Sequence, residues 1–181
     1  MSIARLLSAA ALAALLSACM PLSPLPAEAP ADATAVSGRL PKADLILVKK
    51  SDRRLTLLRN GREIKSYKVS LGRNPGGQKV AAGDGRTPEG DYLIDWRKPD
   101  SKFYKALHIS YPRVSDRRTA EEAGRNPGGA IMIHGLPNDR PRAHHYLPGI
   151  DWTEGCIAVT NREMDEIWHS VRDGTPIRIL P

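Results

Sequence analysis

Cys156 and His134 are the residues of this chain whose types could together perform nucleophilic catalysis. Cys156 lies within residues 151–159 (Asp-Trp-Thr-Glu-Gly-Cys-Ile-Ala-Val), and His134 lies within residues 131–135 (Ile-Met-Ile-His-Gly). A thiolate attacks carbonyl carbons, and an imidazole can take the thiol proton and return it to the departing amine. The pair predicts a cysteine enzyme with Cys156 as nucleophile and His134 as proton donor and acceptor. The alternative for His134 is a hydrogen-bonded histidine of the core.

The glycine before Cys156 is a candidate for transition-state stabilisation. The tetrahedral intermediate of attack on an amide needs donors for its oxyanion, and backbone N–H groups can supply them. Glycine also lets the backbone approach a substrate closely. We therefore expect the N–H groups of Gly155 and Cys156 to act as oxyanion donors.

The N-terminal residues predict export. Residues 1–18 combine one positive charge with an apolar run that is too short for a membrane span, as in a secretory signal peptide. Residues 16–19 (Leu-Ser-Ala-Cys) resemble a bacterial lipobox, which implies a lipid on Cys19; an ordinary signal peptide cut nearby is the alternative. By the same resemblance, Met20 favours the outer membrane. In either case Cys156 has no stable disulfide partner, and its thiol stays free.

The rest of the chain divides into a tether and one domain. Residues 19–41 are rich in Pro and Ala and have no periodic apolar face, so they predict an extended tether. Residues 42–181 are enough for a single domain with one sizeable core. We expect a monomer that meets the membrane through its lipid anchor only.

The basic charge of the chain is spread along the sequence. Lys and Arg number 27 against 20 Asp and Glu, and removal of residues 1–18 would take away only Arg5. Nucleic-acid binding would call for a focused basic stripe, so no nucleic-acid partner is expected. The surplus of basic residues could attract anionic polymers of the envelope. The simpler explanation is a basic surface in contact with solvent.

The first half of the domain predicts strands. Residues 45–48 form a continuous apolar run, and residues 55–57 alternate before Asn60-Gly61, a strong signal for a type I′ hairpin turn. The returning strand alternates at Tyr67, Val69 and Leu71. Because Ile64 is out of that phase, we expect a bulge near Lys65-Ser66.

Two glycine-rich segments, residues 74–77 and 83–90, follow the hairpin. Neither has the Lys-Ser/Thr ending or the spacing of a nucleotide-binding loop, so both predict tight turns rather than phosphate cradles. Residues 91–96 and 106–111 are expected to be further strands.

The second half predicts one clear helix. Residues 115–123 could form a short helix and residues 130–134 a strand that ends at His134. Thr160 and Glu163 form a capping box that starts the clear helix, which Gly174 is expected to end before a strand over residues 175–180. One apolar stripe of this helix is expected to face the core; it comprises Met164, Ile167, Trp168 and Val171. The predicted fold class is mainly β with one well-defined C-terminal helix.

Residues 83–90, 133–135 and 155–157 together resemble the L,D-transpeptidase catalytic domain, also called YkuD. The resemblance extends over roughly residues 43–180 in the order of the family. It implies a β-sandwich-like fold, peptidoglycan stem peptides as substrate, a thioester on Cys156, and no cofactor. Together with the signal peptide and the lipobox, it predicts a periplasmic location in the bacterial cell envelope, with Cys19 as an anchor to the outer membrane.

The chain departs from the family signature around the nucleophile. Thr153 stands where the family commonly has Ser, Glu154 where it has His, and Ala158 where it has Arg. Residues 151–158 resemble a YafK-like subgroup, of which at least one member is regarded as a hydrolase. The departures keep the nucleophile, but the acyl group on it could pass either to an amine or to water. A peptidoglycan-linked lipoprotein is a further candidate partner.

Several residues near the motifs are expected to contact substrate. Gly135, Thr153 and Glu154 are assigned to this group. Glu154 could instead face solvent, or meet a cation such as the amine of a diaminopimelate side chain, because a carboxylate pointing inward would oppose thiolate formation. Arg140 or Arg142 could replace the cation that Ala158 removes.

His144 and His145 raise the alternative of a zinc site. With His134 and Cys156 they offer nitrogen and sulfur ligands, but neighbouring residues point in different directions and no ligand spacing supports the site. We expect no metal and place these histidines in a loop at the cleft. A zinc hydrolase and a non-catalytic peptidoglycan-binding lipoprotein remain as competing hypotheses.

Overall fold

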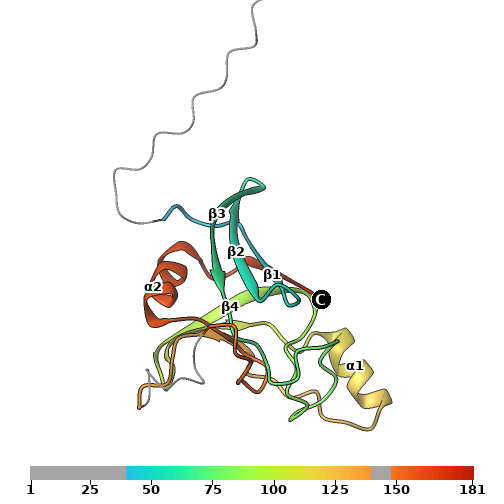
Figure 1. The fold of residues 1–181 in the computed structure, drawn as a ribbon. Coiled ribbons are helices and arrows are strands. Elements are labelled where there is room, and N and C mark those ends of the chain that lie inside the picture. The colour runs from blue at the N-terminus through green and yellow to red at the C-terminus, as the bar shows by residue number, and fades with distance from the viewer. Residues whose placement is uncertain (1–39, 140–147) are drawn as a thin grey trace, which may run out of the picture. The chain divides into compact units, whose positions relative to one another are not determined.

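The computed structural model describes residues 40–139 and 148–181, which form one mixed sheet and two helices (Figure 1). The sheet order is β3-β2-β1-β8-β4-β5-β6-β7, in which β1–β8 and β6–β7 are parallel pairs and the other neighbours are antiparallel. The strands are β1 (Leu45–Lys49), β2 (Arg54–Arg59), β3 (Arg62–Lys68), β4 (Gly90–Ser101), β5 (Tyr104–Ile109), β6 (Met132–His134), β7 (Ile157–Ala158) and β8 (Pro176–Leu180). The helices are α1 (Val114–Glu122) and α2 (Asn161–Ser170), which lie on either side of β4 in Figure 1. The mainly β fold class is confirmed.

The β2–β3 hairpin follows its sequence signals closely. Asn60 and Gly61 both have positive φ angles, 52° and 73°, as a type I′ turn requires. Leu57 pairs with Lys65 whereas Leu58 pairs with Glu63, so one residue of β3, Ile64, is extra. The predicted bulge is therefore present, one residue before the expected place.

The chain after β3 joins the two ends of the sheet. The Ser70 N–H donates to the Ala158 carbonyl (2.9 Å), and the Ala158 N–H donates back to the Ser70 carbonyl (2.8 Å). Since β3 and β7 are the terminal strands of the sheet order, this bridge makes the sheet curl around its core. The fully buried large side chains include Ile46, Leu55, Leu57, Ile94, Leu107, Ile133, Ile157, Met164, Ile167 and Ile177.

Helix α2 starts as predicted but ends earlier. Thr160 caps it: its hydroxyl accepts the Glu163 N–H, and the Glu163 carboxylate accepts the Thr160 N–H. The expected end at Gly174 was wrong, because Val171 already has extended backbone angles (φ −97°, ψ 142°) and packs into the core outside the helix. Trp168 is only partly buried, with the Arg97 guanidinium 4.8 Å from its ring centroid.

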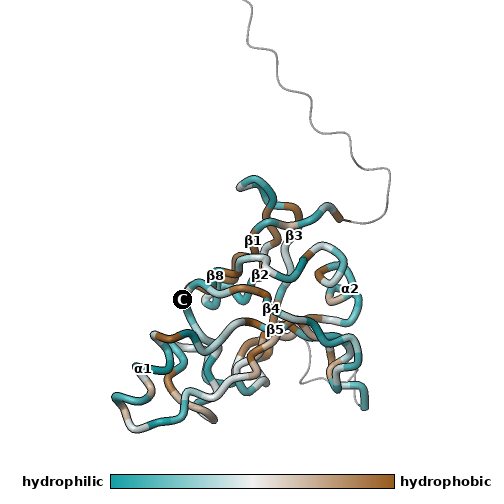
Figure 2. Tube along the Cα trace, turned by 180° about the vertical axis from the view of Figure 1, so that it is seen from behind, coloured by the Kyte–Doolittle hydropathy of each residue, from teal (hydrophilic) through white to brown (hydrophobic). Residues whose placement is uncertain are grey.

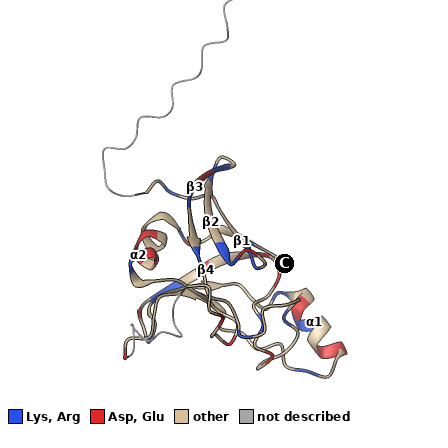
Figure 3. Cartoon of the chain, viewed as in Figure 1, with Lys and Arg blue, Asp and Glu red and all other residues tan. Residues whose placement is uncertain are grey.

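The other elements differ from expectation mainly in length. β4 runs to Ser101, beyond the predicted residue 96, and β6 starts at Met132 because Ala130 has a positive φ of 54°. Helix α1 lies within one residue of its predicted bounds. Apolar residues follow the strands (Figure 2), whereas charges of both signs lie on strands, loops and both helices (Figure 3). In the described ranges no helix is long and apolar enough to cross a membrane.

Candidate active site

His134 is a buried, neutral imidazole at the end of β6. Only 4% of it is exposed, and the rings of Phe103 and Trp152 lie 4.6 and 5.7 Å from its own. Burial lowers the pKa of His134 to about 4, although the hydrogen bond to Gly135 acts in the opposite direction. The Nδ1–H donates to the Gly135 carbonyl (2.7 Å), so Nε2 keeps its lone pair. His134 can therefore accept a proton through Nε2.

Gly135 holds the acceptor for that hydrogen bond in place. A Cβ atom at this position would lie 2.6 Å from the Asn161 Oδ1 and 2.9 Å from the Tyr104 Cβ, so there is room only for glycine. Its N–H donates to the Phe103 carbonyl (3.0 Å). Gly135, which the sequence analysis assigned to substrate, thus has a positioning role toward His134 in this geometry.

Cys156 directly precedes β7 and carries a free thiol. Its Sγ lies 3.6 Å from the Ala130 carbonyl oxygen. Burial raises the pKa of the Cys156 thiol, while a hydrogen bond from the Met132 backbone and the positive charge of Lys79 act to lower it. The residue is therefore a thiol at rest, with one backbone donor already in place for the thiolate.

The pairing of β6 with β7 brings Cys156 and His134 to the same side of the sheet. Ile133 pairs with Ile157 in parallel register, and one step back along both strands sets Cys156 beside Met132. Paired residues of neighbouring strands project to the same face, as do residues two apart along one strand. Met132 and His134 are two apart, so the thiol, which directly precedes β7, and the imidazole at the end of β6 lie on the same face of the sheet.

Thr153 organises the turn before the nucleophile. Its hydroxyl donates to the Cys156 carbonyl (2.7 Å) and accepts the Gly155 N–H (3.1 Å), and the residue is buried. Its hydroxyl is therefore engaged within the turn, which favours a positioning role over the expected substrate contact. The Gly155 N–H would have to leave Thr153 to serve as an oxyanion donor.

Three glycines from distant segments meet behind the nucleophile. Gly155 has φ 133°, and a Cβ there would lie 2.5 Å from the Arg86 carbonyl oxygen. A Cβ on Gly72 would overlap the Gly85 carbonyl and lie 3.1 Å from the Gly155 Cα. Backbone thus packs directly on backbone at this point. Gly155 and the loop containing Gly85 were expected from the sequence, whereas no local pattern indicates Gly72.

Asp84 holds the second glycine-rich loop together. Its carboxylate accepts the backbone N–H groups of Val80, Ala81 and Arg86 and pairs with the Lys79 ammonium at 2.8 Å. Burial alone would raise the pKa of Asp84, but these donors together bring it to about 2. The segment forms a tight turn, as predicted, and its backbone N–H groups donate to the Asp84 carboxylate.

Asp151 fastens the segment that leads to Cys156. One carboxylate oxygen accepts two hydrogen bonds from Arg53, at 2.8 and 3.2 Å, and the other accepts the Leu71 N–H at 2.9 Å. Asp151 opens the motif that contains Cys156, but no role for it was predicted from the sequence. Its side chain fixes that motif to the chain that follows β3.

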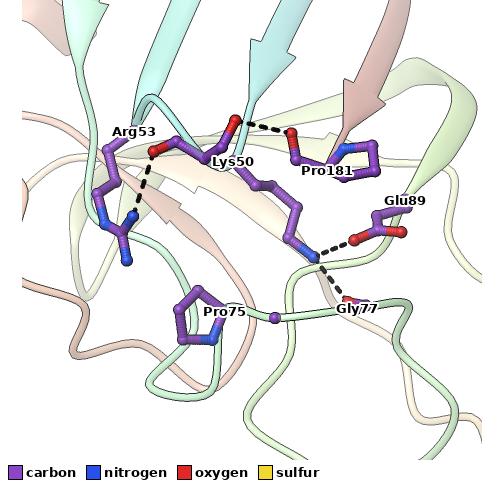
Figure 4. A pocket seen from close by; sticks show the side chains of 8 residues that line it. Lys50, Arg53, Pro75, Gly77, Glu89 and Pro181 are labelled. Carbon is purple, nitrogen blue, oxygen red and sulfur yellow. Dashed lines mark hydrogen bonds and ion pairs between the residues drawn. The ribbon is translucent and has the colours of Figure 1, made fainter.

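Lys50 joins both glycine-rich loops at the end of β1. It is 3% exposed, and its Nζ donates to the Glu89 carboxylate (2.7 Å) and to the carbonyls of Gly77 (2.7 Å) and Thr87 (3.0 Å). Figure 4 shows the ammonium pointing toward Glu89 and Gly77 at the side of a pocket of about 280 Å³. Neither Cys156 nor His134 lines this pocket, so Lys50 is a structural cation.

A second pocket lies next to His134. It has a volume of about 430 Å³ and is lined by Lys102, Phe103, Pro137, Asn138 and Asp139. Phe103 is also the ring that contacts His134. This pocket, which the sequence analysis did not identify, is a candidate space for a substrate near the base.

Glu154 is solvent-exposed and forms an ion pair with Arg73, so its carboxylate faces outward. Ala158 is buried in β7 between Ser70 and His134.

Cys19, Arg140, Arg142, His144 and His145 lie outside the described residues. Within the described part of the chain, no group of three His, Cys, Asp or Glu side chains could hold a metal ion.

The chain is similar to known proteins in sequence and fold. The chain is 35% identical over 109 residues to YafK of Escherichia coli (strain K12), which is provisionally named an L,D-transpeptidase; the match covers 59% of this chain and 36% of YafK. The helical cell shape determining protein Pgp2 of Campylobacter jejuni superposes with a TM-score of 0.59 and 28% identity, over 75% of this chain and 46% of Pgp2. Bd1075 of Bdellovibrio bacteriovorus gives a TM-score of 0.54 and 26% identity, over 78% of this chain and 52% of Bd1075.

The chain thus spans about half or less of each of these relatives. The L,D-transpeptidase catalytic domain model, YkuD, matches residues 43–179, which contain both glycine-rich loops, His134 and Cys156. This chain belongs to the L,D-transpeptidase catalytic domain (YkuD) family.

Proposed function

We propose that this chain is a cell-envelope cysteine enzyme that acts on the stem peptides of peptidoglycan through a thioester on Cys156. The observation that supports this most directly is that a free thiol and a neutral imidazole lie on the same face of the sheet, where Nδ1 of His134 is fixed by Gly135. Membership of the family and the likeness to Pgp2 and YafK support the substrate class.

The proposed reaction starts from a neutral pair. Sγ of Cys156 attacks the carbonyl carbon of the third stem residue while Nε2 of His134 takes the thiol proton. The imidazolium then gives this proton to the amine of the departing D-alanine, and the thioester remains. Burial raises the pKa of the thiol and lowers that of the imidazole, which favours proton transfer during the attack over a thiolate formed beforehand.

The second half of the reaction decides between transfer and hydrolysis. An amine that attacks the thioester gives a cross-link or an exchanged D-amino acid, and water gives a tripeptide. A hydrolase of the same fold, including one that releases a peptidoglycan-linked lipoprotein, is therefore the second candidate. Its motivation is the local departure from the family signature at Glu154 and Ala158.

Mass spectrometry of muropeptides mixed with purified protein tests both candidates. We expect cross-linked or exchanged products from a transferase and tripeptides from a hydrolase. Cys156→Ser should reduce either product at least about 1,000-fold and leave the fold intact. Val114→Ala, an exposed change on α1, is the matched control. Undiminished turnover by Cys156→Ser would refute the thioester mechanism.

A non-catalytic peptidoglycan-binding protein would behave differently toward a reactive drug. A carbapenem should acylate the wild-type thiol, giving a mass increase that Cys156→Ser lacks. Binding of peptidoglycan without any acylation or turnover would favour the binding protein over both enzyme candidates.

For its location, we propose a periplasmic protein anchored to the outer membrane through a lipid on Cys19. The support is the sequence of residues 16–20 alone. Incorporation of labelled palmitate into the full-length chain in a bacterial host, and its loss in Cys19→Ala, would test the anchor. Palmitate incorporation that persists in Cys19→Ala would exclude it.

A further inference from the structure

A row of paired residues runs across the sheet from Cys156 to an exposed tryptophan. Trp96 of β4 pairs with His108 of β5, and His108 pairs with Met132 of β6. The parallel register of β6 and β7 sets Cys156 next in the row. Residues paired in this way project to one face of the sheet, so all four lie on the face of the nucleophile.

Trp96 is held in a fixed orientation although 43% of it is exposed. Its ring stacks on the His108 ring with centroids 4.6 Å apart and an angle of 14°. The Nδ1–H of His108 donates to the Asp95 carboxylate at 2.6 Å, which fixes the imidazole beneath the indole. One face of the indole is thus covered by His108, while the residue as a whole remains exposed.

A local irregularity of β4 produces this exposure. Ile94 pairs with Ile109 and Trp96 with the adjacent His108, so Asp95 is an extra residue in β4. The bulge lets the buried Ile94 point into the core while Asp95 and Trp96 both reach the outer face. Isolated exposed apolar residues are common on proteins, but a bulge, a stacked ring and a charged hydrogen bond together favour a built binding platform.

We propose that Trp96 and His108 form a platform that binds a sugar ring of the glycan strand whose stem peptide reaches Cys156. The C–H groups on one face of a β-linked hexopyranose carry partial positive charge, and the face of an indole ring is negative. A flat indole stacked on an imidazole is suited to that contact, and the neighbouring Asp95 carboxylate can accept hydrogen bonds from hydroxyl groups. This inference rests on the proposed function, because it assumes that the peptide end of the same molecule is attacked.

The distance along the row fits the length of the stem. Three strand spacings separate Trp96 from Cys156, which is about 14 Å. Three extended residues span about 10 Å, and the link between the sugar and the first residue adds a few ångströms. A sugar on Trp96 would therefore place the bond after the third stem residue near the thiol.

Paired substrates test the platform. We expect Trp96→Ala to raise the KM for a disaccharide tetrapeptide about tenfold, with kcat within twofold and no change for the free tetrapeptide. Trp96→Phe should keep most of the binding, and Val114→Ala, an exposed apolar change on α1, should behave as wild type. Equal effects of Trp96→Ala on both substrates, or no effect on either, would overturn the platform.

A binding measurement keeps this inference separate from the proposed reaction. Chitotetraose is a β-linked oligosaccharide without peptide. We expect it to shift the indole N–H signal of Trp96 in the NMR spectrum of the Cys156→Ala variant. The shifted signal should be missing in the double variant that carries both Cys156→Ala and Trp96→Ala. A wild-type protein that turns over neither substrate but shows this shift would refute the reaction and keep the platform. Turnover of the disaccharide tetrapeptide with no shift at millimolar chitotetraose would refute the platform and keep the reaction.

Discussion

The β1–β2–β3–β8 region and the region around Cys156 are held together by different forces. In the first, alternating apolar side chains such as Ile46, Leu57 and Ile177 are fully buried between regular strands. In the second, short strands and loops are fastened by the carboxylates of Asp84 and Asp151 and the hydroxyl of Thr153. Apolar packing tolerates small shifts, whereas hydrogen bonds fix direction. The nucleophile therefore lies in the region whose geometry is directionally defined.

The largest change in stability is expected from the first region. Leu57→Ala should lower the free energy of unfolding by about 3 kcal/mol, because it leaves a cavity beneath β2. Activity per folded molecule should stay within twofold. Urea denaturation and turnover at low temperature measure the two effects. A large loss of activity in the fully folded variant would show that the two regions are not separable.

The pH dependence of stability should come from the second region. His134 has a pKa near 6.5 when unfolded and about 4 when folded, so between these values the unfolded chain binds the extra proton. Stability should therefore fall as the pH falls from about 6.5 to 4, by about 3 kcal/mol. Urea midpoints at pH 7 and pH 4.5 for the wild type and His134→Gln test this. A wild-type midpoint that falls no more than that of the variant would contradict a depressed pKa.

Thr153→Val should affect activity more than Leu57→Ala does, at a smaller cost in stability. It removes the acceptor of the Gly155 N–H and the donor to the Cys156 carbonyl, which should lower stability by about 1 to 3 kcal/mol. Turnover should fall about tenfold because the turn that carries the thiol loosens. Thr153→Ser should restore both properties. Wild-type turnover by Thr153→Val would show that the turn does not depend on this hydroxyl.

Glu154→Gln should have the smallest effect. Both Glu154 and Arg73 are largely exposed, so loss of their ion pair should change stability by less than about 0.5 kcal/mol. The rate at which iodoacetamide alkylates Cys156 should stay within twofold at each pH, because the carboxylate faces outward. A marked acceleration in the variant would mean that Glu154 suppresses the thiolate.

Sequence patterns predicted the regular elements well where local chemistry alone specifies them. The Asn60-Gly61 turn and the Thr160–Glu163 capping box are as expected because their signals depend on neighbouring residues only. The end of α2 was wrong because Val171 leaves the helix in order to pack into the core, which is a tertiary effect.

The reactive residues of the site were predicted from their types, but the contacts that position them were not. The hydrogen bond from His134 to the Gly135 carbonyl and the outward position of Glu154 became evident only in the three-dimensional structure. So did the contact between Gly72 and Gly85, since a glycine in the sequence does not reveal which backbone approaches it.

The amino-acid sequence by itself determined the family, the mainly β fold class and the choice of Cys156 and His134 as the reactive pair, because these depend on residue types in a fixed order. Only the tertiary structure decided the neutral state of His134, the engagement of the Gly155 N–H and the row from Cys156 to Trp96. Burial, strand register and bulges arise from contacts between residues far apart in the chain, and no local pattern encodes them.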